Sequence, residues 1–161
     1  MNNRTNFIPQ IIDYFIPLIH RYNLVYEKIF GLDFSTTSFP REFGFDEKYI
    51  FRSSSSNHLY LNFCIKHLSI SSSDTFLDIG CGKGKVLNLV RKYNFRKISG
   101  IEIVEEISTI AKSNFKLLTD SRVSIFNVNA VDFVDYEDYN FIYMYNPFPP
   151  ETMKSVIYNI G

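Results

Sequence analysis

TFLDIGCGKGKVL, residues 75–87, places three glycines at alternate positions between an apolar run and a helix-like pattern. The run DTFLDI (74–79) is short and mostly apolar, which is typical of a strand buried on both faces of a parallel sheet. A glycine-rich turn from such a strand into a helix lets a ligand approach the main chain, and the helix N-terminus attracts negative charge. The stretch therefore predicts a strand–turn–helix unit with a ligand at the turn.

Apolar residues recur at helical spacing on both sides of this unit, and strand-like runs lie between them. The predicted helices carry Leu61, Cys64, Ile65 and Leu68; Val86, Leu89, Val90 and Tyr93; Ile107, Ile110, Ala111 and the imperfect Asn114; and Met153, Val156, Ile157 and Ile160. The further strand-like runs are 97–103, 122–128 and 140–146. Strands alternating with helices predict parallel βαβ units with right-handed crossovers, in a three-layer, doubly wound α/β fold.

The N-terminal third differs from this pattern, so residues 1–55 are predicted to be a helical and irregular segment and 56–161 the core. Residues 1–30 favour a helix broken near Pro17, and 31–52 favour irregular structure. The apolar segment 7–19 is too short and too interrupted to span a bilayer, so we expect an amphipathic helix lying on the domain.

Composition and charge exclude several kinds of partner. The 161 residues are 45% hydrophobic and 21% charged with no formal net charge, which fits one globular domain and does not indicate nucleic acid or a membrane. Basic residues gather between Lys83 and Lys97 and are interpreted as a solvated helix face. The two cysteines and three histidines lack metal-ligand spacing, so no metal is predicted, and the thiols are interpreted as reduced in a cytoplasmic protein.

The glycine spacing separates the possible ligands. A dinucleotide fingerprint has a third glycine where this chain has Lys85, and a P-loop has four residues between its glycines. The pattern here is D-x-G-x-G-x-G, with Asp78 just ahead of the glycines. FLDIGCGKGKVL closely resembles the first motif of class I S-adenosylmethionine-dependent methyltransferases, which implies a Rossmann-like core with S-adenosylmethionine as the cofactor.

The resemblance extends to two further strand ends. Glu102 ends the second strand 22 positions after Gly80, where a carboxylate can accept hydrogen bonds from both ribose hydroxyls. In NVNAVDF (127–133), Asn129 and Ala130 align with the family's adenine-binding pair, although Asp132 is a rival and a plain loop is the alternative. The cofactor-binding residues implied are Asp78, Gly80, Cys81, Gly82, Gly84, Glu102, Asn129 and Ala130.

YMYNPFPPE (143–151) ends the fourth strand and resembles the Asn-Pro-Pro-aromatic motif of methyltransferases that act on nitrogen. It also resembles the Asn-containing motif of the non-SET nucleosomal lysine methyltransferases, and most closely the Asn-Pro-Phe motif of small methyltransferases of unassigned substrate. This implies that Asn146, Pro147 and Phe148 place the acceptor, with protein lysine or another amine favoured. The alternative for this motif is a rigid turn that starts a helix.

Family members usually carry seven strands, whereas this chain offers four in the expected order 3-2-1-4. The fourth strand would then be an open apolar edge, covered by a partner chain, a second copy or the N-terminal helices, unless the chain is truncated. A catalytically silent scaffold that binds S-adenosylmethionine and works through a partner is therefore the alternative function. A nucleotide-linked oxidoreductase is a third, which Lys85 disfavours.

Overall fold

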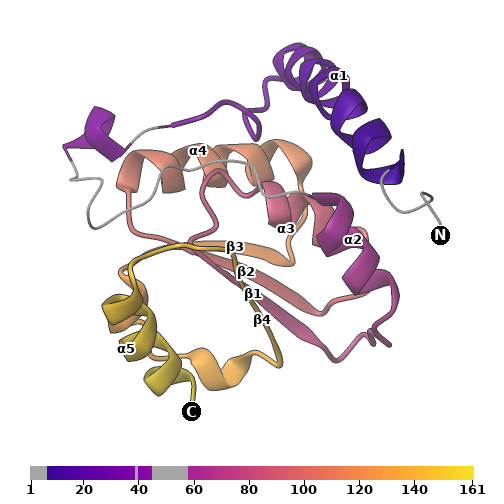
Figure 1. Ribbon diagram of the computed structural model, residues 1–161. Coiled ribbons are helices and arrows are strands. Elements are labelled where there is room, and N and C mark those ends of the chain that lie inside the picture. The colour runs from indigo at the N-terminus through magenta and orange to yellow at the C-terminus, as the bar shows by residue number, and fades with distance from the viewer. Residues whose placement is uncertain (1–6, 39, 45–57) are drawn as a thin grey trace.

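The computed structural model describes residues 7–38, 40–44 and 58–161, and its centre is a four-stranded parallel sheet (Figure 1). The strands are β1 (Thr75–Ile79), β2 (Lys97–Glu102), β3 (Val123–Asn127) and β4 (Phe141–Met144). Their order is β3-β2-β1-β4, and every neighbouring pair is parallel. The predicted α/β fold and its strand order are confirmed.

Helices cover both faces of the sheet, which makes three layers (Figure 1). The helices α2 (His58–Lys66), α3 (Lys85–Val90) and α4 (Glu105–Leu118) lie on one side, and α5 (Pro150–Ile160) lies on the other. The remaining elements are α1 (Phe7–Phe30) and the short 3-10 helices η1 (Pro40–Phe43), η2 (Ala130–Asp132) and η3 (Tyr136–Asp138).

Two hydrophobic clusters fill the spaces between the layers, and β1 contributes to both. Phe76 packs with Val86 and Ile98 on one face, and Leu77 and Ile79 join the cluster on the other. All five residues of β1 are buried. This agrees with the apolar run 74–79, because successive side chains of a strand point to opposite faces.

The predicted helical faces are only partly correct. Cys64 is exposed, and Leu68 lies beyond the end of α2 and is 48% exposed. Tyr93 lies beyond the short α3, and Ile157 on α5 is 54% exposed. Tyr93 is nevertheless half-buried against the cluster that contains Phe76. The exposed residues show that apolar spacing alone does not bury a side chain.

Helix α1 departs from the prediction in two ways. It continues through Pro17 rather than breaking there, and Pro17 is exposed. Most of its described apolar side chains are also exposed: Leu18, Tyr22 and Ile29 are more than half exposed, although Leu24 is half-buried. No helix in the described ranges is long and apolar enough to cross a membrane.

Strand β4 forms an open edge of the sheet. It pairs with β1 on one side, and the described part of the chain supplies no strand on the other. Its four residues are all half-buried, which agrees with the predicted apolar edge.

Gly84 controls how α3 packs on α4. It caps α3 with a left-handed backbone (φ 85°), and a Cβ at this position would lie 2.5 Å from the ring of Phe115. Gly44 has a similar backbone (φ 78°), but a Cβ there would meet nothing within 4 Å. The two glycines therefore separate the cost of the backbone from the cost of packing.

We expect Gly44→Ala to lower the free energy of unfolding by about 1 kcal/mol, the cost of the left-handed conformation for an L-residue. Gly84→Ala adds overlap with Phe115 and should lower it by about 2–4 kcal/mol. Denaturant unfolding of both variants measures the difference. Equal losses would show that the contact with Phe115 does not limit the packing.

Candidate functional site

The glycine loop, residues 80–84, is tied to the end of β2. The backbone N–H groups of Gly80 and Cys81 both donate to the carbonyl oxygen of Ile101, each at 2.9 Å. The N–H of Gly84 donates to the carbonyl of Cys81 at 2.9 Å and closes the turn. The loop is therefore a fixed cradle of backbone between β1 and α3.

Cys81 serves the core rather than the surface of this cradle. Its side chain is buried, and its sulfur lies 2.6 Å from where a Cβ on Gly100 would stand. Burial raises the pKa of the Cys81 thiol, as do the nearby charges of Asp78 and Glu102. Any contact with a cofactor would come from the main chain of Cys81, since the thiol points into the core.

Glu102 holds the inner side of the glycine loop. Its carboxylate is 7% exposed and accepts hydrogen bonds from the N–H of Gly82 at 3.0 Å and the N–H of Val104 at 2.9 Å. Burial raises its pKa, and these N–H donors lower it in part. Each carboxylate oxygen accepts more than one hydrogen bond, so Glu102 keeps capacity for hydroxyl donors.

Asp78 is a buried carboxyl group without a hydrogen-bond partner among the described residues. It is the second-last residue of β1, close to the glycine loop, and is 3% exposed. Burial, together with the nearby charge of Glu102, raises its pKa to about 8. Buried carboxyl groups are normally paired, so a ligand carrying a donor or a positive charge would satisfy this one.

The glycine loop touches the motif that follows β4. A Cβ on Gly80 would lie 2.7 Å from the Cβ of Pro147, and Gly80 has a left-handed backbone (φ 78°). Only glycine allows this approach. The structure thus brings together Gly80 and Pro147, which lie 67 residues apart in the sequence.

The neighbours of Pro147 differ in their environments. Asn146 is exposed and has a left-handed backbone (φ 47°), a conformation that asparagine tolerates better than most residues. Phe148 is half-buried and packs against the cluster that contains Val156. Asn146 is therefore presented to solvent beside the cradle, while the ring of Phe148 anchors the turn.

The predicted adenine-binding pair lies at the end of β3. The Oδ1 of Asn129 accepts a hydrogen bond from the N–H of Val131 at 3.1 Å and caps η2. Ala130 is buried, and its carbonyl accepts a hydrogen bond from the hydroxyl of Tyr136 at 2.6 Å. The rival Asp132 is exposed.

Two site-adjacent residues escaped the sequence interpretation. Lys83, interpreted as part of a solvated face, is 6% exposed and pairs with Asp33 at 2.7 Å, because the segment after α1 covers it. Asn114, the imperfect member of the apolar face of α4, is 2% exposed and bonds to both Asp33 and Lys83. In the sequence, the only sign of these contacts was the polar Asn114 at a helical position where an apolar residue is expected.

The described ranges contain no group of three or more His, Cys, Asp or Glu side chains that could hold a metal ion.

The buried pair Asp78 and Glu102 predicts an unusual pH dependence of stability. A carboxyl group whose pKa is raised on folding binds more protons in the native state, so the free energy of unfolding falls as pH rises from 3.8 to about 8. We expect Asp78→Asn to flatten this slope, with the exposed Asp135→Asn as the control. Denaturant unfolding between pH 4 and pH 8 measures it; an unchanged slope in Asp78→Asn would contradict the assignment.

Comparison with solved structures agrees with the architecture. The methyltransferase domain of bacterial CtHen1-CN superposes with a TM-score of 0.55 at 20% identity, over 65% of this chain and 60% of that one. A dimethyladenosine transferase from Plasmodium falciparum has the same TM-score and identity, over 64% of this chain and 36% of that one. This chain thus spans less than two thirds of either structure. At this identity the likeness shows a shared fold.

Sequence comparison is more specific. A search of curated proteins gave no match. The profile of the family described as "Histone methylation protein DOT1" matches residues 55–146, from the approach to α2 through to Asn146. The match takes in the glycine loop, Glu102 and the end of β4, and it covers more than half of the 161-residue chain. The chain belongs to the DOT1 histone methylation family.

Proposed function

We propose that this protein transfers a methyl group from S-adenosylmethionine to a nitrogen acceptor, with a protein lysine or another amine favoured. The observation that carries the proposal is the contact between Gly80 and Pro147. It joins the cradle expected to hold the cofactor to the Asn-Pro-Phe turn expected to hold the acceptor. Membership of the DOT1 family supports methyl transfer to protein.

The residues around the cradle fit S-adenosylmethionine. Glu102 keeps acceptor capacity for ribose hydroxyls. Asp78, which has no hydrogen-bond partner among the described residues, suits a ligand that carries an ammonium group. Gly80 and Gly82 leave the cradle without side chains that would fill it. Asn129 and Ala130, at the end of β3, would hold the adenine. When bound, the cofactor supplies an electrophilic methyl group on a sulfonium.

Asn146 is the residue proposed to orient the acceptor. The oxygen of its side-chain amide can accept a hydrogen bond from an amine N–H. This would orient the amine so that its nitrogen lone pair faces the methyl group. Orientation of this kind is worth effective molarities of about 10⁵–10⁸ M, without a covalent intermediate on the protein. The acceptor amine must present a neutral lone pair and give its proton to solvent.

A silent scaffold that binds S-adenosylmethionine is the alternative, and the open edge of β4 favours it. An unpaired strand edge is a template for another chain, either a partner or a second copy. Methyl transfer by a monomeric chain would exclude this alternative.

Titration with S-adenosylhomocysteine tests the cofactor site. We expect binding by the wild-type chain and a loss of about 1–3 kcal/mol in Glu102→Ala, because ribose hydroxyls lose their acceptor. Glu102→Gln, which keeps one acceptor oxygen, should lose less, and the exposed Glu106→Ala should bind normally. A folded wild-type chain that does not bind would exclude the proposed function.

Substitution of Asn146 separates the acceptor from the cofactor. We expect Asn146→Ala and Asn146→Gly to abolish transfer to lysine peptides and histones and to leave the affinity for S-adenosylhomocysteine unchanged. The glycine variant tolerates φ 47°, so it removes the amide without straining the turn. A parallel loss of cofactor binding in both variants would refute this role.

A further inference from the structure

We infer that the segment 31–38, here called the strap, positions the glycine loop for the cofactor through an ion pair between Lys83 and Asp33. The inference rests on the proposed function, since it assigns a role at the same cofactor site. Lys83 stands within the glycine loop itself, between Gly82 and Gly84. The strap follows directly after α1 and comes from the N-terminal segment that the sequence separates from the core.

The ion pair is well placed to couple the two segments. The ammonium of Lys83 lies 2.7 Å from Oδ2 of Asp33 and also donates to the hydroxyl of Thr36. That hydroxyl donates in turn to Oδ1 of Asp33. Partial burial would raise the pKa of Asp33, but the hydrogen bonds from Lys83 and Thr36 outweigh it and lower the pKa. Lys83 is 6% exposed, so its charge depends on this partner.

A side-chain amide ties the same two segments through their backbones. The Oδ1 of Asn114 accepts from the N–H of Asp33 at 2.9 Å, and its Nδ2 donates to the carbonyl of Asp33 at 2.9 Å. The Nδ2 also donates to the carbonyl of Lys83 at 3.1 Å. One residue of α4 therefore holds both the strap and the glycine loop.

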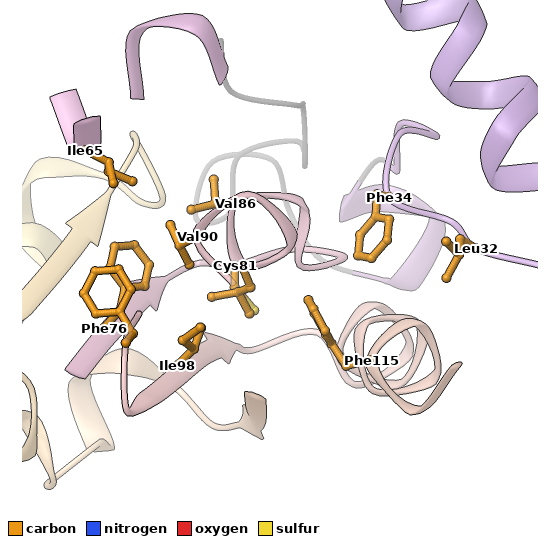
Figure 2. Packing of buried hydrophobic residues seen from close by; sticks show 11 residues of the cluster. Leu32, Phe34, Ile65, Phe76, Cys81, Val86, Val90, Ile98 and Phe115 are labelled. Carbon is orange, nitrogen blue, oxygen red and sulfur yellow. The ribbon is translucent and has the colours of Figure 1, made fainter. Parts of the chain in front are cut away.

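The strap is itself held in place by hydrogen bonds to α1 and by packing against α4. The carboxylate of Glu27 on α1 accepts from the N–H of Phe34 at 3.0 Å, the N–H of Ser35 at 2.8 Å and the hydroxyl of Ser35 at 2.6 Å. Phe34 is buried and meets the ring of Phe115 edge-on, with the ring centroids 5.7 Å apart (Figure 2). The strap is thus part of the packed structure around the loop.

These contacts hold the glycine loop on two sides. Glu102 fixes the N–H of Gly82 from within the sheet, and the strap fixes the next residue, Lys83, from outside. A loop held in its binding conformation loses less entropy when a ligand binds than a loop that must first become ordered. The strap therefore contributes to cofactor affinity by holding the glycine loop in place.

Titration with S-adenosylhomocysteine tests the inference in Lys83→Met and Asp33→Asn. We expect Lys83→Met to raise the Kd about tenfold, within the range of typical coupling between sites, and Asp33→Asn to raise it less, because the amide still accepts a hydrogen bond. Lys97→Met is the matched control: Lys97 pairs with Asp138 at 2.9 Å but starts β2, at the opposite end from the glycine loop. Its Kd should stay within twofold of wild type.

Hydrogen exchange is a second measurement. If the strap only stabilised the fold, binding of S-adenosylhomocysteine would not change the exchange rates of its amides. Coupling is reciprocal, so S-adenosylhomocysteine should slow exchange at the amides of Asp33, Phe34 and Ser35 in the wild-type chain. If Lys83→Met does not fold, Asp33→Asn decides, because Asn114 bonds to the backbone of residue 33 rather than to its carboxylate.

The outcomes separate the two proposals. Two results would overturn the role of the strap and leave the cofactor site intact. One is wild-type affinity in folded Lys83→Met or Asp33→Asn, and the other is amide exchange in the strap that does not change when S-adenosylhomocysteine binds. A folded wild-type chain that does not bind S-adenosylhomocysteine would overturn the proposed function and the role of the strap together.

Discussion

Close backbone packing where β1 meets the glycine loop sets the geometry of the whole site. A Cβ on Gly80 would overlap Pro147, and one on Gly84 would overlap Phe115. On the neighbouring strand, a Cβ on Gly100 would overlap Cys81. Side chains are absent at these positions, so the turn after β4, helix α4 and strand β2 all approach the loop. The glycine loop, the Asn-Pro-Phe turn and the strap are therefore built around the same short stretch of main chain.

The cradle also concentrates an electrostatic cost. Asp78 and Glu102 are both buried, the charge of Glu102 raises the pKa of Asp78, and Asp78 has no hydrogen-bond partner among the described residues. Such an arrangement lowers the free energy of unfolding at neutral pH. A ligand with donors and a positive charge would recover the loss, which is why these two carboxyl groups favour a binding site over a structural one.

The strap adds a different kind of polar contact. Lys83 and Asn114 are polar residues at positions where the pattern of the chain favours either solvent or an apolar side chain, and both are buried. Both bond to Asp33, so the two residues that depart from the expected pattern lie at the same place in the structure. Residues that break a local rule often lie at functional sites. The N-terminal segment is thereby connected to the glycine loop.

Much of the fold was predictable from local patterns. The apolar run 74–79 predicted β1, and the alternation of runs with helical spacing predicted a parallel sheet. The resemblance to class I methyltransferases implied the order β3-β2-β1-β4, which the structure has. Glu102 also lies against the glycine loop, because the ends of parallel strands meet at one edge of the sheet. Helix faces were less certain, as Cys64 and Ile157 show, since burial depends on a neighbour that periodicity does not reveal.

The contacts between distant segments could not be predicted. Pro147 against Gly80 and Asp33 against Lys83 join residues 67 and 50 positions apart in the sequence. No local pattern specifies such a pair, because each depends on where whole elements pack. The sequence determined the strands, the order of the sheet and the residue types at the cradle. Tertiary packing decided which of these residues meet, since it sets the distances on which their charges and hydrogen bonds depend.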